Sequence, residues 1–429
     1  ADAGIAARVE GTESSVFVGC GAFDYSGFVT RRAEAATEHG MTGSVLSICA
    51  NRVSFAFHLT GTSAAVDTAC SSAATALSLA LADARERDFS ALRTPPHRDD
   101  PTTRHTQQDG SSKLRATIVA GVQICQNPGT SAAFEKLGVL SPTGRCRPFA
   151  KGADGYVRSE GAGAIVLLPV DVATREGLRI YAVVEAATCG SDGRNQALTT
   201  PNEAAQTRLL EATYADDAEN LVYVEAHGTG TKVGDPREAR AIGAFLRNRF
   251  PAAERRKKLR IGSVKANVGH AECASAMASI IKVALMAWRG VVFGTPCHGT
   301  VLPALKAAGL ELQTTLEPIG GDFGGPGTTT RTTKKKFTTT TQRPKTTKQS
   351  TMTTRRRLFG VNSFGFGGAN AHVVLAEPPS PPRQPPPLAL ARRRSKKKTA
   401  KVVPFVVVAS SGANAVQAAE EWAAWPGRA

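Results

Sequence analysis

The sequence predicts an α/β fold with two related halves, each built around a buried, largely parallel sheet. Short apolar strands alternate with helical patterns along the chain, and two strand–turn–helix segments look alike. The first runs through VDTACSS (66–72) and the second through GSVKANVGH (262–270). Strands that alternate with helices are typical of sheets covered by helices. With 429 residues, the chain is long enough to bury a large core.

The individual elements follow from local composition. Short runs of β-branched and small apolar residues, bounded by turn formers, predict strands. We expect these at 15–19, 65–68, 117–122, 164–168, 180–186, 221–225 and 260–264. Helical spacing of apolar residues predicts helices at 72–87, 203–214, 236–249 and 271–288. The two look-alike turns, at Cys70 and His270, therefore each stand between a strand and a helix.

The formal net charge of +17 comes from two low-complexity segments. Residues 321–357 hold ten Lys and Arg against one Asp, and residues 378–401 hold eight and no acid. A basic surplus confined to such tracts does not indicate a charged face on a folded domain, so we do not expect nucleic acid as the main partner. No apolar stretch approaches the roughly 20 residues that span a bilayer.

Three segments interrupt the α/β pattern. Residues 94–113 and 320–357 are polar or low in complexity, and we expect both to be surface insertions. Residues 378–401 are rich in Pro and end in basic residues, which predicts an extended linker. The start of the chain resembles a point inside a helix, so we expect a fragment of a longer protein, incomplete at its N-terminus. Residues 402–429 resemble the start of a further unit.

The eight cysteines are scattered, with no C-x-x-C pair and no zinc-like spacing. The first residues, ADAGIAARVEG, contain neither the basic nor the apolar region of a secretion signal. We therefore expect a cytoplasmic protein with reduced thiols and without a metal site.

Cys70 is the first candidate for chemistry. It lies between a strand and a helix, where the positive end of the helix dipole and free backbone N–H groups stabilise a thiolate. Small neighbours such as Ala69 and Ser71 leave room for a substrate. A buried, inert cysteine is the alternative at this position.

Two further motifs contain histidines. EAHGTGT (225–231) places His227 at the end of a strand and follows it with a loop of Gly and Thr. The hydroxyls of Thr229 and Thr231 are suited to hydrogen-bond a polar tether. Asp235 and Pro236 can equally mark a helix start. In the second motif Lys265 and His270 lie five residues apart and can face one pocket, although a solvated Lys and a His near a helix cap are the simpler alternative.

The fourth motif, NSFGFGGANAH (362–372), holds two Phe among several Gly. The tight loop that we expect here can supply backbone N–H groups to an oxyanion hole, or it can be a plain glycine hairpin.

Together, in this order, the four motifs resemble the β-ketoacyl synthase (ketosynthase) domain of type I modular polyketide and fatty-acid synthases. Residues 137–167, LGVLSPTGRCRPFAKGADGYVRSEGAGAIVL, add to the likeness. The resemblance implies a thiolase-like fold with a layered α-β-α-β-α core. It places the ketosynthase domain at 1–377, and makes 402–429 the beginning of a linker towards an acyltransferase domain.

The resemblance also implies a role for each motif. Cys70 matches the nucleophile, His227 and His270 match the two catalytic histidines, and Lys265 matches a lysine that tunes the site. The N–H groups of Cys70 and Phe366 would form the oxyanion hole. Residues expected to bind the phosphopantetheine arm are Thr229, Thr231, Phe366 and Gly367.

The implied reaction is decarboxylative Claisen condensation of a Cys-bound acyl chain with a malonyl-type extender. The substrates would be carried on the 4′-phosphopantetheine arm of an acyl carrier protein, with no tightly bound cofactor, and the enzyme would be a homodimer. The sequence differs from the family's usual pattern at two positions of one helix, where Ala276 and Ser279 replace Gly. We expect these side chains to tighten packing near the site. Ala369 replaces a Thr.

The main alternative is a catalytically silent ketosynthase-like partner that serves as a scaffold or sets chain length. Such relatives lose the nucleophile, whereas Cys70 and both histidines are present here. A thiolase would be expected to have a second reactive cysteine near the C-terminus, and no cysteine follows Cys297. A papain-like hydrolase is disfavoured because only Cys-Ser-Ser stands at the nucleophile.

Overall fold

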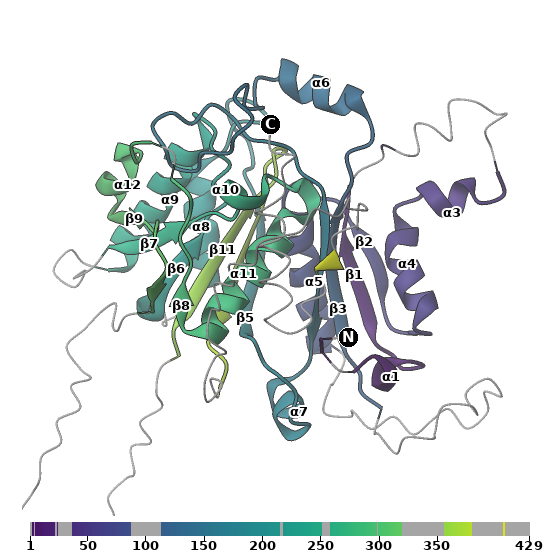
Figure 1. Cartoon of the computed structure of the whole chain (residues 1–429). Coiled ribbons are helices and arrows are strands. Elements are labelled where there is room, and N and C mark those ends of the chain that lie inside the picture. Colours follow the sequence, from purple (N-terminus) through teal and green to yellow (C-terminus); the bar gives the residue numbers. More distant parts are fainter. Residues whose placement is uncertain are drawn as a thin grey trace, which may run out of the picture.

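The computed structural model describes residues 2–3, 5–21, 24, 37–86, 113–214, 218–250, 258–297, 299–319, 356–379 and 406–407. Nearly all of the two expected insertions, of the Pro-rich linker and of the segment after it lie outside the described residues. In the described part, two mixed sheets are stacked with helices between them and on both outer faces (Figure 1). The predicted α-β-α-β-α layering is confirmed.

The first sheet has the strand order β13-β4-β3-β1-β2. Its strands are β1 (Ser15–Gly19), β2 (Ser63–Val66), β3 (Thr117–Gln123), β4 (Gly161–Leu167) and β13 (Val406–Val407). β1 is parallel to β2 and to β3, and β3 is antiparallel to β4. β2 is therefore an edge strand among the described elements.

The second sheet has the order β5-β12-β11-β6-β7-β9. Its strands are β5 (Val183–Ser191), β6 (Leu221–Glu225), β7 (Leu259–Gly262), β9 (Leu310–Leu312), β11 (Leu358–Phe364) and β12 (Ala369–Ala376). β6 is parallel to β7 and to β11, and β11 is antiparallel to β12. A short antiparallel pair, β8 (Val291–Val292) with β10 (Glu317–Pro318), lies outside both sheets.

The two sheets repeat one plan. The order β4-β3-β1-β2 corresponds to β12-β11-β6-β7, with the same parallel and antiparallel pairings at each step. In this correspondence the turn that follows β2 holds Cys70, and the turn that follows β7 leads to His270. The duplicated architecture predicted from the two look-alike segments is confirmed, although the sheets are more mixed than the expected parallel ones.

The helices after these turns, α5 (Ser72–Glu86) and α11 (Ser275–Arg289), form the central layer. α5 contacts β1 and β3 of the first sheet and β5 of the second, and α11 contacts β4, β11 and α5. Small side chains allow this close approach, since Ala73, Ala74, Ala76 and Ala276 are all buried there. The largest apolar cluster of the chain fills the space between the sheets, with Leu77, Met277 and Phe359 among its members.

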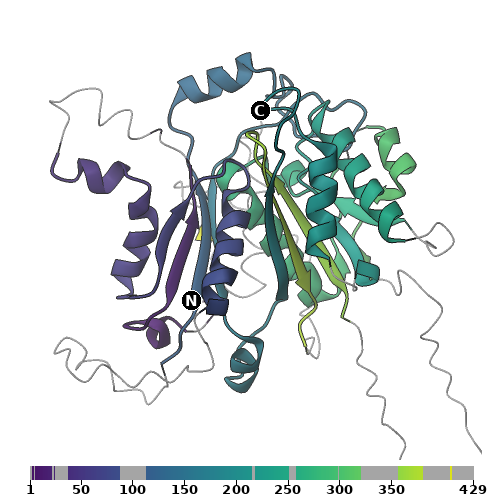
Figure 2. The same ribbon diagram turned by 180° about the vertical axis from the view of Figure 1, so that it is seen from behind.

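The outer faces are covered by the remaining helices. On the first sheet, α4 (Ser47–Ala56) packs on β1 and β2, and α3 (Gly40–Ser44) contacts α4. α1 (Ala6–Val9) and α7 (Val170–Arg175) add Val9 and Val172 to the apolar cluster that includes Val16 and Val18 of β1. On the second sheet they are α8 (Glu203–Thr213), α9 (Gly234–Arg249) and α12 (Pro303–Ala308). Short helices η4 (Ala218–Asn220), α10 (Lys265–Val268) and η5 (Glu272–Ala274) lie in connections, and α6 (Pro128–Lys136) stands beyond the sheet ends (Figures 1 and 2).

None of the described helices is both long enough and apolar enough to cross a membrane. All eight cysteines are free thiols.

We predict that Gly19→Ala destabilises the chain by about 1–3 kcal/mol, because the new methyl group overpacks the central layer. A Cβ at Gly19 would lie 2.6 Å from Ala73 Cα and from the backbone carbon of Ser72, so α5 and its N-terminal turn would have to move. The control is Gly161→Ala in β4, where a Cβ meets nothing within 4 Å. Urea unfolding measures both changes. Equal free energies of unfolding for the two variants would contradict the close packing of α5 on β1.

Candidate active site

Cys70 lies in the sharp turn between β2 and α5, with only 8% of its surface exposed. Ala69 before it has a φ of +54°, in the left-handed region that is unfavourable for a residue with a Cβ. The hydroxyl of Ser72 holds this turn, since it donates to the Ala69 carbonyl (2.6 Å) and accepts from the Thr68 N–H (2.9 Å). These hydrogen bonds hold the strained backbone of Ala69, so that the chain passes directly from Cys70 into α5.

The backbone of Cys70 is tied to both halves of the fold. Ser363, on β11 of the second sheet, donates its hydroxyl to the Cys70 carbonyl at 2.8 Å. Ser275, at the start of α11, makes a longer contact of 3.4 Å with the same oxygen. The Phe366 backbone N–H donates to the Cys70 thiol. The nucleophile candidate therefore stands where the two sheets and the central helices meet.

His227 follows β6, and hydrogen bonds from its backbone fix its position. Its N–H donates to Glu238 Oε1 at 2.7 Å, and the next N–H, of Gly228, donates to Oε2 at 2.9 Å. The Nδ1 atom of the ring accepts the Phe364 N–H at 3.3 Å. Because Nδ1 is an acceptor, the proton of the neutral ring lies on Nε2.

His270 shows the same arrangement. Its Nδ1 accepts the Glu272 N–H at 3.1 Å, so its neutral ring also has the proton on Nε2. The rings of His227 and His270 lie edge to face, with centroids 5.4 Å apart and planes at 84°. The structure thus brings together the two histidines that the sequence placed in separate motifs.

Lys265 is 2% exposed and holds positive charge near both histidines. Burial lowers the pKa of Lys265, while the carboxylates of Glu225 and Glu238 oppose the shift. Burial, followed by the charge of Lys265, lowers the pKa values of His227 and His270 well below the ordinary value. Both rings are therefore neutral at neutral pH and act as hydrogen-bond donors through Nε2.

The expectation of a stabilised thiolate at Cys70 is wrong in sign. Burial, then the charges of Cys273 and Glu272, raise the pKa of the Cys70 thiol to about 12, although Lys265 and the Phe366 N–H act in the opposite direction. The helix N-terminus predicted a lowered pKa, but the cost of removing a thiolate from water outweighs it at this depth. The resting side chain is a protonated thiol.

The residues expected to bind a pantetheine arm lie beside this centre. Thr229 and Thr231 follow His227, with their hydroxyl oxygens 3.3 Å apart. The loop between them needs Gly230, whose φ is +79° and where a Cβ would come within 2.8 Å of the Arg147 nitrogen. Phe366 has 49% of its surface exposed, and the neighbouring Gly367 is also exposed.

Two buried carboxylates accept hydrogen bonds from the loop that follows His227 and hold its backbone in place. The sequence did not predict these hydrogen bonds. Glu238 accepts the two backbone N–H groups described above and the Asn362 side chain at 2.8 Å. Asn362 in turn bonds His372 at 2.6 Å, and His372 bonds Tyr214 at 2.9 Å. Asp235 lies in the first turn of α9, which begins at Gly234, one residue before the helix start that Asp235 and Pro236 could mark. Its carboxylate also accepts the N–H groups of Phe149 (2.6 Å) and Gly230 (3.1 Å). The only sequence signal for Glu238 is helical spacing from Asp235.

A second missed group is the buried ion pair between Glu225 and Lys282. Lys282 Nζ lies 2.6 Å from Glu225 Oε2, and the Tyr223 hydroxyl donates to the same oxygen at 2.7 Å. Glu225 Oε1 accepts the Val264 N–H at 2.5 Å. Through this carboxylate the turn before Lys265 is fixed to the strand that ends at His227.

The two departures on α11 lie in its buried face. Ala276 and Ser279 are both 1% exposed. Within the described part of the chain, the Ser279 hydroxyl has no hydrogen-bond partner. The tighter packing expected from these two residues stays a prediction.

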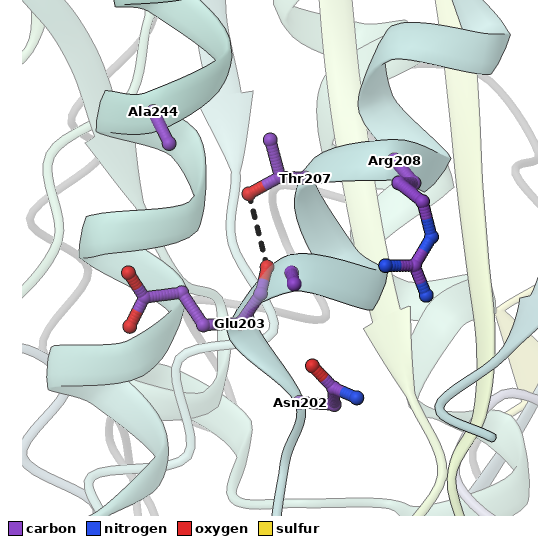
Figure 3. Close-up of a pocket in the computed structure, with 6 residues that line it drawn as sticks. Asn202, Glu203, Thr207, Arg208 and Ala244 are labelled. Atoms are coloured by element: carbon purple, nitrogen blue, oxygen red, sulfur yellow. Dashed lines mark hydrogen bonds between the residues drawn. The ribbon is translucent and has the colours of Figure 1, made fainter. Parts of the chain in front are cut away.

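A separate hollow of about 600 Å³ lies between α8 and α9 (Figure 3). Its lining is formed by Asn202, Glu203, Ala204, Thr207, Arg208 and Ala244, so it includes none of the predicted site residues. Among the described residues, no group of three or more His, Cys, Asp or Glu could hold a metal ion.

Comparison with protein families gives three matches. The β-ketoacyl synthase N-terminal domain matches residues 1–91 and 110–173, and the C-terminal domain of the same enzyme matches residues 181–297. A ketoacyl-synthetase C-terminal extension matches residues 339–425. The first two matches together cover more than half of the chain.

Curated relatives are polyketide synthases. A phenolphthiocerol/phthiocerol polyketide synthase from Mycobacterium tuberculosis is 34% identical over 85% of this chain and 16% of its own length. The lovastatin diketide synthase of Aspergillus terreus is 34% identical over 86% of this chain and 12% of its own length. The chain thus spans less than a fifth of these two relatives.

Solved structures agree in fold. The ketosynthase from module 6 of the bacillaene synthase of Bacillus subtilis superposes with a TM-score of 0.68 and 26% identity, over 88% of this chain and 56% of that one. The oxazolomycin ketosynthase domain of Streptomyces albus gives 0.65 and 30%, over 87% of this chain and 56% of that one. The thiolase-like fold expected from the motifs is confirmed.

We predict that the rate of Cys70 alkylation by iodoacetamide rises without a plateau from about pH 7 to about pH 10. Only the thiolate reacts, and a thiol with a pKa raised to about 12 gains thiolate about tenfold per pH unit across this range. The Cys70 peptide is quantified by mass spectrometry, with N-acetylcysteine in the same samples to correct for the reagent. A plateau near neutral pH would show a stabilised thiolate and contradict the effect of burial.

Proposed function

Because the chain belongs to the β-ketoacyl synthase family, we propose that it catalyses a decarboxylative Claisen condensation that extends an acyl chain held on Cys70. The observation that carries the proposal is a pair of neutral histidines, with protons on Nε2 and ring centroids 5.4 Å apart, beside a buried Lys265 whose charge also acts on Cys70. The substrates would be a thioester of the growing chain and a malonyl-type extender, each on the phosphopantetheine arm of an acyl carrier protein.

The first half-reaction transfers the acyl group to Cys70. The sulfur forms a bond to the thioester carbonyl carbon, the bond from that carbon to the pantetheine sulfur breaks, and the thiol proton ends on the departing sulfur. Negative charge develops on the carbonyl oxygen during this exchange. The N–H of Phe366, which contacts the Cys70 sulfur, is placed to stabilise that charge together with the N–H of Cys70 itself.

The second half-reaction begins when the extender loses CO₂. The bond between its carboxyl carbon and the neighbouring methylene carbon breaks, and the electron pair remains as an enolate. His227 and His270 donate hydrogen bonds from Nε2 to the enolate oxygen. The carbanion carbon then forms a bond to the acyl carbonyl carbon, and the bond from that carbon to the Cys70 sulfur breaks. The β-ketoacyl product leaves on its carrier, and the Cys70 thiolate takes a proton from water.

Neutral histidines suit this role because they stabilise the enolate without giving it a proton. A protonated imidazole would quench the carbanion before it could attack. Burial and the charge of Lys265 lower the pKa values of His227 and His270, and these low values are therefore needed for the proposed reaction. Thr229 and Thr231 would hold the pantetheine arm, with Phe366 and Gly367 at its entrance.

Partners follow from the same proposal. A carrier protein must deliver both substrates, and residues 1–377 would act as the ketosynthase domain of a larger chain, with 378–401 as a linker and 402–429 leading towards an acyltransferase. A homodimer is supported by β2, a half-buried strand next to the nucleophile turn, whose outer edge pairs with no other described strand and can pair with a second copy. We also propose the cytoplasm as its location.

A silent scaffolding partner is the alternative, and an acylation experiment separates the two. After incubation with a short acyl-pantetheine thioester, intact-mass spectrometry should show one acyl adduct on the chain and none on Cys70→Ala. Cys189→Ala, which removes an exposed thiol, serves as the control and should keep the adduct. Absence of the adduct on the folded wild-type chain would contradict the proposed catalytic role and favour the scaffolding role.

We predict that His270→Ala separates the two half-reactions. Acylation of Cys70 should persist, while condensation with a malonyl thioester should fall about 10²–10³-fold, the usual effect of removing one donor to a developing oxyanion. The adduct is followed by mass spectrometry and the β-ketoacyl product by chromatography. Loss of acylation to the same extent would instead assign His270 to the transfer step.

A further inference from the structure

The segment that precedes β4 holds the main chain of His270. The His270 N–H donates to the Val157 carbonyl at 2.8 Å, and the Ser159 N–H donates to the His270 carbonyl at 3.0 Å. These two bonds form an isolated parallel bridge between Arg158 and His270. Tyr156 adds a side-chain contact, since its ring centroid lies 4.9 Å from that of the imidazole. The backbone of His270 is therefore fixed independently of its ring nitrogens.

The ring itself is held by Glu272, whose backbone N–H donates to His270 Nδ1 at 3.1 Å. Glu272 has a φ of +39°, in the left-handed region that is unfavourable for a residue with a Cβ. Such a conformation persists only where surrounding contacts maintain it. The hydrogen bond to the ring therefore depends on the contacts that hold Glu272.

Those contacts are made by the Glu272 carboxylate. Arg158 donates from Nε to Oε1 at 2.6 Å and from Nη2 to Oε2 at 2.9 Å, and Gln123 Nε2 donates to Oε2 at 2.9 Å. The side chains of Arg158 and Glu272 are only 8% and 11% exposed. Arg158 is oriented in turn by Ser131, whose Oγ accepts from Nη1 at 2.7 Å. Paired bonds of this kind fix the orientation of the carboxylate as well as its distance.

We propose that Arg158 is a positioning residue for His270. Through its paired bonds to the Glu272 carboxylate, it keeps in place the N–H that Nδ1 accepts. Because Nδ1 remains an acceptor, the ring proton stays on Nε2 and points in one fixed direction. Arg158 thus acts through Glu272 and not on the substrate. The role rests on the proposed function only in that the Nε2 proton is assigned to the enolate oxygen.

Nitrogen-15 NMR of the chain with labelled histidines tests this positioning and needs no turnover. In Arg158→Gln the Nδ1 signal of His270 should move, because this nitrogen loses the hydrogen bond that it accepts, while the signals of His227 should not. Arg158→Lys keeps the charge but cannot make the paired bonds, so it should move the same signal. Arg8→Gln breaks a partly buried ion pair with Glu176 elsewhere in the fold (2.8 Å) and is the matched control, which should leave both rings unchanged.

A His270 signal that stayed in place in Arg158→Gln would overturn the proposal. Equal movement of both rings would overturn it too, since that indicates general loosening of the chain. If thermal melting showed that Arg158→Gln does not fold, Glu272→Gln would give the same test. That substitution keeps the shape of the side chain and the backbone N–H but loses one of the paired bonds, so it should also move the His270 signal.

A double-mutant cycle on the reaction rate gives a second test. Arg158→Gln should slow condensation on the order of 10–100-fold, the cost of a misplaced group, and should leave acylation of Cys70 intact. In the His270→Ala background the same substitution should cost nothing further, because Arg158 acts only through that ring. Additive losses would contradict the positioning role.

The two readouts separate this proposal from the proposed function. If the wild-type chain performed no condensation while the His270 signal responded as expected, the positioning role would stand and the proposed reaction would fail. If Arg158→Gln slowed condensation without moving the His270 signal, the reaction would stand and the positioning role would fail.

Discussion

The hydrogen bond from Ser363 to the Cys70 carbonyl oxygen is the contact on which the site depends. It joins the nucleophile turn of the first half to β11 of the second at 2.8 Å, and Ser275 approaches the same oxygen from α11. Ala69 in this turn is held in the left-handed region, a strain of about 1–3 kcal/mol that persists only where surrounding contacts maintain it. A shift of either sheet would therefore move Cys70 relative to the histidines.

Buried carboxylates extend this constraint to the second half. Glu238, Asp235 and Glu225 each accept backbone N–H groups from the loops that hold His227 and Lys265. A buried carboxylate is costly unless its hydrogen bonds are satisfied, and here loop N–H groups satisfy them. The charges of Glu225 and Glu238 also oppose the lowering of the Lys265 pKa by burial. The buried carboxylates thus determine both the conformation of these loops and the electrostatics of the site.

Much of the fold could be predicted from the sequence, because its strands and helices are strongly patterned. The strands expected at 15–19 and 221–225 are β1 and β6, and the helices expected at 72–87 and 203–214 differ from α5 and α8 by one residue each. The NSFGFGGANAH motif was expected as a tight loop or as a glycine hairpin, and it is the hairpin that joins β11 to β12, with residues 365–368 as its turn. Its small residues lie at the centre of a sheet, where tertiary packing outweighs local propensity.

The sequence predicted which residues form the candidate site, but it did not predict the ionisation state of Cys70. Motif order identified Cys70, His227, Lys265 and His270, but the Cys70 pKa depends on depth of burial, which no local pattern contains. Lys282 gave no signal, and Glu238 gave only its helical spacing from Asp235, because charged residues on helices usually face solvent. Phe134, on α6, belongs to no motif, yet its ring packs edge to face against Phe366 with centroids 5.8 Å apart.

The central claim is that His227 and His270 are neutral and have their protons on Nε2. Nitrogen-15 NMR of the chain with labelled histidines tests it most directly, with His227→Gln and His270→Gln used to assign the two rings. We expect both rings to show the neutral Nε2–H form at about pH 7 and to stay neutral well below the ordinary histidine pKa of about 6.5. An imidazolium signal at neutral pH, or a proton on Nδ1, from either ring would contradict the account.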